Sequence, residues 1–168
     1  MKKGLSYLVA CWCLVFTSLS LADRVIIHMN LLAKKGLGES IGTVTATDTE
    51  YGLLLTPDLS SLPTGMHGFH IHDNSSCANG GMSAGGHFDP KYTTKHLGPY
   101  NDQGHLGDLP VLLVEQNNKA KTPVLAPRLK VADIKGHALI VHLHGDNYLD
   151  KPEKNGGGGA MLACGIIR

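Results

Sequence analysis

The chain has 168 residues, of which 42% are hydrophobic and 17% are charged, a composition typical of one folded domain with its own core. Lysine and arginine exceed aspartate and glutamate only by 15 to 14, so no basic excess indicates a nucleic-acid or membrane partner. The partner is expected to be a small molecule.

The N-terminus has the features of a secretory signal peptide. Residues 1–3 supply a positive start, residues 5–21 are largely apolar, and small side chains permit cleavage after Ala22. A transmembrane anchor is the competing interpretation, but an apolar run of about 17 residues is at the short limit for spanning a bilayer. A lipoprotein cleavage box at Cys11 is a third, although the apolar run continues beyond that cysteine. We expect residues 23–168 to form the mature, exported domain.

Eight segments have the apolar runs or period-two alternation of β-strands. They are residues 24–33, 40–47, 51–55, 66–72, 109–114, 122–130, 136–144 and 160–167. Pro57 and Asp58 should end the third segment, and Pro123 and Pro127 place the sixth at a sheet edge. The pattern predicts an all-β fold, an eight-stranded Greek-key sandwich or flattened barrel with two long functional loops.

The two loops are residues 73–110 and 146–159. Both are rich in glycine and asparagine, and the first also contains several histidines. Loops of this length are uncommon inside a compact domain unless they are functional, and metal ligands spread along the first loop would explain how it becomes ordered.

Six candidate metal ligands are concentrated between residues 67 and 108, and both copper and zinc accept imidazole and carboxylate ligands. They are His70, His72, His87, His96, His105 and Asp108. On an extended strand, two histidines two positions apart share a face, so the first pair can bind one ion. A metal site is therefore favoured over a chance grouping.

Two cysteines remain after removal of the leader, which carries Cys11 and Cys13. Two cysteines in an exported protein indicate one bridge, here between Cys77 and Cys164. Closing a loop of roughly 87 residues would stabilise the fold by about 4 to 5 kcal/mol in the chain-entropy account.

The mature chain resembles the bacterial, exported copper-zinc superoxide dismutases along nearly its whole length. The matching motifs are HGFHIH (67–72), SAGGHFDP (83–90), KHLGPY (95–100), GHLGDLP (104–110), APRLK (126–130), VH and GDN (141–147), and a final GGGG and ACG. Several ordered motifs are far more specific than one HxH pair. The resemblance implies a periplasmic enzyme that dismutates superoxide to dioxygen and hydrogen peroxide, with one copper ion and one zinc ion per subunit.

The resemblance also assigns roles to individual residues. Its copper ligands are His70, His72, His87 and His142, and its zinc ligands are His87, His96, His105 and Asp108. His87 is then the catalytic bridge, which takes up a proton when copper is reduced. Asp146 matches a carboxylate that links a copper histidine to a zinc histidine. Cys77 and Cys164 match the family's disulfide.

One position departs from the family pattern. Three residues before Cys164, where the family usually has an anion-guiding arginine, this chain has Met161. A guanidinium beside an anionic substrate raises the association rate, so we expect slower catalysis and weaker inhibition by small anions. Lys95, Lys151 and Lys154 are candidate substitutes, and the alternative is that Met161 is an ordinary strand residue that the enzyme tolerates.

Four further histidines need an interpretation. His144 shares a predicted strand face with His142 and could be a fifth copper contact, but an exposed imidazole at the start of a loop is the simpler account. His28 could join an additional metal or cofactor site at a subunit contact, although a lone histidine is a weak signal. His67 and His137 are interpreted as structural or surface residues.

Two other functions compete with the enzyme. A copper-storing or copper-delivering protein with impaired dismutase activity is suggested by Met161, but a bridging His87 and a complete zinc set are not needed for storage. A zinc hydrolase is disfavoured, because three histidines and one aspartate leave zinc no open position for water. Both a homodimer and a monomer are compatible with the sequence.

Overall fold

The computed structural model describes residues 22–34 and 36–168, and within them the chain forms nine strands. They are β1 Arg24–Ala33, β2 Gly36–Thr49, β3 Gly52–Leu59, β4 Gly65–His67, β5 Phe69–His72, β6 Leu112–Val114, β7 Val124–Ala126, β8 Ala138–His142 and β9 Met161–Ile166. Three helical turns accompany them: the 3-10 helices η1 (Met82–Ala84) and η2 (Lys154–Gly157) and the short α-helix α1 (Val131–Ile134). In this part of the chain no helix has the length and apolar character needed to cross a membrane.

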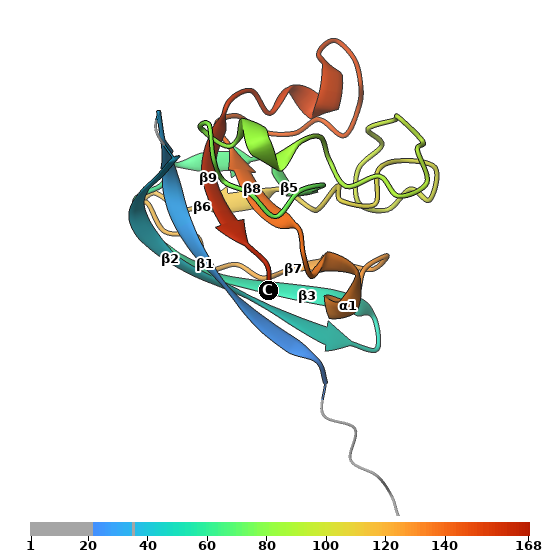
Figure 1. The fold of residues 1–168 in the computed structure, drawn as a ribbon, viewed down its shortest axis with the longest axis horizontal. Coiled ribbons are helices and arrows are strands. Elements are labelled where there is room, and N and C mark those ends of the chain that lie inside the picture. Colours follow the sequence, from blue (N-terminus) through green and yellow to red (C-terminus); the bar gives the residue numbers. More distant parts are fainter. Residues whose placement is uncertain (1–21, 35) are drawn as a thin grey trace, which may run out of the picture.

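Seven strands form one antiparallel sheet in the order β5-β8-β9-β1-β2-β3-β7, and β4 pairs with β6. Figure 1 shows this sheet curled into a half-barrel around the core. The alternation of the strands explains the core, since every second side chain points inward, as with Phe69 and Ile71 on β5 and Leu139 and Val141 on β8. All four are fully buried. The all-β prediction is confirmed.

The structure has one strand more than predicted, because residues 66–72 divide at Gly68. The Gly68 N–H donates to the carbonyl of His144 at 2.7 Å, and the Gly68 carbonyl accepts from the N–H of His142 at 2.8 Å. On either side of it, β4 pairs with β6 and β5 pairs with β8. Residues 65–72 therefore contribute one strand to each of the two sheets.

The prediction that Pro57 and Asp58 end the third strand is wrong. β3 continues through both residues, and Val44 of β2 lies opposite Pro57. On its other side β3 pairs with β7 only through residues 53–55, so a proline nitrogen without a hydrogen is tolerated beyond them. β7 itself is the last strand of the sheet, the edge position that its flanking prolines predict.

The two long loops extend from the same side of the sheet (Figure 1). One connects β5 to β6 and the other connects β8 to β9. A disulfide between Cys77 and Cys164, with Cα atoms 5.8 Å apart, fastens the first loop to β9, which confirms the predicted bridge. The proposed signal peptide, with Cys11, lies outside the described residues except for Ala22.

Candidate metal centre

Backbone hydrogen bonds bring two stretches of the first loop, around Phe88 and Gly107, alongside β5. The N–H of Ile71 donates to the carbonyl of Gly107 at 2.9 Å, and the carbonyl of Ile71 accepts from Phe88 at 2.8 Å. A Cβ at Gly107 would lie 2.3 Å from the Ile71 oxygen, so only glycine permits this approach. His87 and Asp108, the neighbours of the two loop residues, are thereby placed beside the histidines of β5.

Four histidines form the first group of potential metal ligands. His70, His72, His87 and His142 each offer one nitrogen, and these atoms lie within 4.8 Å of one another. His72 directs Nδ1 to the carbonyl of Gly85 at 2.9 Å, and His142 directs Nδ1 to the carbonyl of Gly159 at 3.1 Å. Their Nε2 atoms consequently face each other, 3.4 Å apart. Two imidazoles whose Nδ1 atoms are held by carbonyls present Nε2 to a common point.

The second group shares two members with the first. His70, His87, His96 and Asp108 also offer ligand atoms within 4.8 Å of one another. Around the carboxylate, Asp108 Oδ1 lies 2.9 Å from His87 Nδ1 and Oδ2 lies 3.0 Å from His96 Nδ1. His105 adjoins this group, with its Nδ1 3.4 Å from Asp108 Oδ1. Three imidazoles thus surround one buried carboxylate.

Asp146, at the start of the second loop, connects the two groups. Its Oδ2 lies 2.8 Å from His70 Nε2, and its Oδ1 lies 2.8 Å from His96 Nε2. All three side chains are fully buried. A Cβ at Gly156 would lie 1.8 Å from Asp146 Oδ1, so the glycine run of this loop leaves space for the carboxylate.

Three buried nitrogens in or beside the two groups make no well-formed hydrogen bond within the described residues, although two of them lie close to Asp108. They are the Nδ1 atoms of His70, His96 and His105. An unpaired buried nitrogen costs free energy unless another ligand satisfies it. Since Asp146 holds the opposite nitrogen of His70 and of His96, the His70 Nδ1 atom is free for a ligand other than protein, and the His96 Nδ1 atom lies beside Asp108 Oδ2, where both could bind one metal ion. The donor set of imidazoles and one carboxylate fits copper and zinc.

The acid–base properties of His72, His142 and Asp108 suit metal binding. Burial, with a smaller contribution from His87, lowers the pKa of His72 to about 3, and burial lowers the pKa of His142 to about 4. Neutral imidazoles have a free lone pair for a metal. Burial would raise the pKa of Asp108, but the adjacent imidazoles of His105, His87 and His96 outweigh it and hold the pKa below its usual range. The carboxylate is therefore ionised, as a zinc ligand must be.

Met161 begins β9 and lies opposite His142 in the β8–β9 ladder, at a bulge. Its side chain packs against the disulfide loop, since a Cβ at Gly81 would lie 2.7 Å from the Met161 sulfur. The residue is partly buried and borders a small cluster that includes Cys77 and Cys164. The departure from the family pattern is thus adjacent to a residue of the first group.

The remaining histidines lie outside both groups. His144 and His28 are exposed. His67 is buried with Nδ1 2.8 Å from the carbonyl of His142 and Nε2 2.8 Å from the carbonyl of Pro63, a structural role as expected. His137 directs Nδ1 to the carbonyl of Asp73 at 2.8 Å.

Several residues that support the groups were not identified from the sequence. Asp150 accepts the backbone N–H of His96 at 2.9 Å. Tyr148 lies against Gly98, where a Cβ would lie 2.8 Å from its ring, and its hydroxyl accepts from the N–H of Val111. These contacts join residues about 40 to 50 positions apart, which no local pattern reveals. Only their position after the GDN motif could have suggested them.

Comparison with known proteins identifies the family and the fold. Residues 40–167 match the family described as Copper/zinc superoxide dismutase (SODC). The chain is 49% identical to a Superoxide dismutase [Cu-Zn] of Legionella pneumophila over 92% of this chain and 93% of the relative. Its structure is similar to the Cu/Zn superoxide dismutase of Brucella abortus, with a TM-score of 0.83 and 43% identity over 87% of this chain and all of that one. It is also similar to the monomeric copper, zinc superoxide dismutase of Salmonella enterica, with a TM-score of 0.78 and 49% identity over 87% of this chain and all of that one.

Proposed function

Since the chain belongs to the copper/zinc superoxide dismutase family, and is therefore an oxidoreductase that dismutates superoxide with copper and zinc, we propose a ligand set for each metal. Copper is bound by His70, His72, His87 and His142. Zinc is bound by His87, His96, His105 and Asp108.

The position of His87 is the observation that supports this assignment most directly. Its Nδ1 lies 2.9 Å from Asp108 Oδ1 in the second group. Its ring centroid lies 4.0 Å from that of His70 and 5.0 Å from that of His72 in the first group. Of the two ring nitrogens, Nδ1 would therefore hold zinc and Nε2 would hold copper.

When bound, copper supplies the one-electron redox chemistry, and zinc, which has no accessible redox step, supplies a fixed positive charge. The chain's own residues do the rest. Asp146 accepts the Nε2 protons of His70 and His96 and so fixes both rings. His87 keeps Nδ1 toward Asp108, holds a proton at Nε2 in one half of the cycle and delivers it in the other. Burial lowers the pKa of His87, so the ring is neutral and offers a lone pair to a metal.

Replacement of the bridge tests the proposal. In His87→Gln, we expect copper and zinc to bind still, while the copper absorption spectrum and reduction potential no longer respond to removal of zinc. Dismutase activity should fall, because proton delivery at Nε2 is lost. His144→Gln, at an exposed histidine outside both groups, is the matched control and should behave as wild type. Coupling between the metals that persists in His87→Gln would contradict the assignment.

The copper-storage alternative is not favoured. The relatives at 49% and 52% identity are named Superoxide dismutase [Cu-Zn]. Storage also gives no reason for a histidine shared between two ligand groups or for the Asp146 link. The effect of Met161 on rate is part of our proposal and is developed below.

We further propose export to the periplasm and retain the homodimer as a proposal. The leader features of residues 1–22 and the Cys77–Cys164 disulfide support export, since such bonds persist in oxidising compartments. Met66, 63% exposed, lies opposite Leu113, 42% exposed, and the pair offers an apolar contact. The Salmonella enterica relative, by contrast, is described as monomeric. Cell fractionation tests the first proposal, and a monomeric mass in sedimentation velocity would contradict the second.

A further inference from the structure

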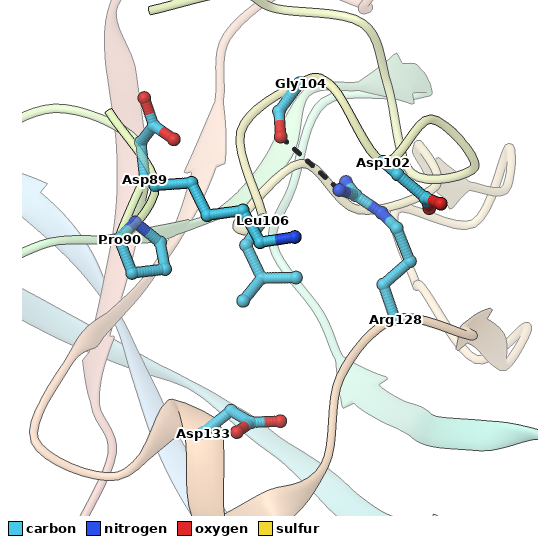
Figure 2. Close-up of a pocket in the computed structure, with 8 residues that line it drawn as sticks. Asp89, Pro90, Asp102, Gly104, Leu106, Arg128 and Asp133 are labelled. Carbon is cyan, nitrogen blue, oxygen red and sulfur yellow. Dashed lines mark hydrogen bonds between the residues drawn. The ribbon is translucent and has the colours of Figure 1, made fainter. Parts of the chain in front are cut away.

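Arg128 donates hydrogen bonds to four backbone carbonyls of the loop that carries the proposed zinc ligands. Nε donates to Pro99 at 2.8 Å, and Nη2 donates to His105 at 2.6 Å and to Gly98 at 3.2 Å. Nη1 adds a longer bond to Gly104 at 3.4 Å, drawn in Figure 2. Among the described residues no carboxylate lies within 4.0 Å of this guanidinium. The N–H groups of Arg128 are therefore used in hydrogen bonds to the loop backbone.

The arginine extends from a rigid part of the barrel. It follows the edge strand β7 and lies between two buried side chains, Ala126 and Leu129. The next turn, α1, is held by Asp48, which accepts the N–H of Val131 at 2.7 Å. Figure 2 shows the side chain reaching from this base across a cavity of about 430 Å³ to the loop. One side chain thus connects the barrel to an otherwise irregular segment.

The four carbonyls lie among the proposed zinc ligands. Gly98 and Pro99 follow His96 by two and three positions, and His105 is itself a proposed ligand. Where a loop makes few backbone bonds of its own, a guanidinium that satisfies several carbonyls fixes the path of the chain. We propose that Arg128 is a positioning residue that pre-forms the zinc site by holding residues 98–105 in the binding conformation. This inference rests on the proposed zinc ligand set.

If Arg128 acts through its charge or through positioning, its replacement changes zinc affinity in opposite directions, which makes the inference testable. A cation close to a zinc site repels zinc, so removing the charge alone should strengthen zinc binding. Loss of the carbonyl contacts should weaken zinc binding, because part of the binding free energy is then used to order the loop. Contacts that orient metal ligands typically change metal affinity by about 10- to 100-fold. We expect the positioning effect to dominate.

The experiment measures zinc affinity by competition with a chromophoric chelator, using the full mature protein with copper already bound. Arg128→Met should weaken zinc binding about tenfold and speed zinc release. Arg128→Lys keeps the charge but loses the planar fork, so it should also weaken zinc binding. Lys91→Gln removes a charge from an exposed residue of the same cavity and should leave zinc affinity within about twofold of wild type.

A second readout separates positioning from general stability. In the zinc-free proteins, hydrogen exchange should be faster in Arg128→Met at the Gly104 and His105 amides, with exchange in β8 unchanged. Zinc affinity in Arg128→Met equal to or tighter than wild type would overturn the inference, whatever the melting temperature. Failure of the proposed ligand set is distinguishable, because it would appear as unchanged zinc affinity in Asp108→Asn, with Arg128 intact.

Discussion

Replacing Met161 with arginine tests whether a guanidinium beside the proposed copper ligands raises the rate of this enzyme. Met161 lies opposite His142 across the β8–β9 ladder, and its side chain runs toward Gly81. Opposed residues in antiparallel strands are about 4.5 to 5.5 Å apart at Cα. For an arginine at position 161 we take a separation of about 8 Å between its guanidinium and an anion at the first histidine group as the working value.

The size of the effect follows from Coulomb's law. At about 8 Å, a unit charge stabilises a monovalent anion by about 0.5 kcal/mol in water and by about 2 kcal/mol at an effective dielectric constant near 20. With a tenfold rate change for every 1.4 kcal/mol or so, these values bracket a gain of about twofold to thirtyfold. We expect Met161→Arg to raise the second-order rate constant for superoxide within this range and to tighten inhibition by azide.

The assay is superoxide consumption after pulse radiolysis, with copper and zinc content measured on the same samples. The gain should be largest near 0.01 M salt, where the Debye length is about 30 Å, and should shrink near 0.15 M, where it is about 8 Å. Met161→Gln, which is polar but uncharged, is the control and should show neither the gain nor the salt dependence. A fully metallated Met161→Arg with an unchanged rate at low salt would refute the reasoning and show that another cation already guides the anion.

Three further predictions concern the scaffold of the site. Asp146→Asn should weaken zinc binding by about 10- to 100-fold in chelator competition, because an amide cannot accept from two imidazole N–H groups as the carboxylate does; unchanged affinity would argue against this role. The metal-free protein should melt at the highest temperature near pH 6.5. Below that pH the unfolded chain binds more protons than the folded one, since burial lowers the pKa of His72 from 6.5 to about 3, so stability falls on acidification. For His96, burial lowers the pKa, but the neighbouring carboxylates outweigh it and raise the pKa to about 9. The contribution of His96 to the free energy of unfolding is therefore lost as the pH rises from 6.5 through 9. A melting temperature that keeps rising above pH 7 in calorimetry would contradict this. Replacing Cys77 and Cys164 together by serine should lower the free energy of unfolding by about 4 kcal/mol in urea titrations. A loss below about 1 kcal/mol would show that the bridge does not stabilise the fold through the entropy of loop closure.

Chemistry carried by short, regular stretches was predictable from the sequence. Alternation alone places Phe69 and Ile71 on the core side of a strand and the neighbouring histidines on the other, because successive side chains of a strand point to opposite faces. The all-β class follows from the same periodicity. The disulfide required only that two cysteines remain beyond the predicted leader.

Only the tertiary structure decided which distant residues support the site. Arg128 lies in a motif that the sequence analysis matched without assigning a role, and its carbonyl partners are more than 20 positions away. The split at Gly68 and the continuation of β3 through Pro57 likewise depend on which strand lies alongside. The sequence by itself determined the types of ligand and their local spacing. Packing determined which loop meets which strand, because the free energy of those contacts depends on the whole folded chain.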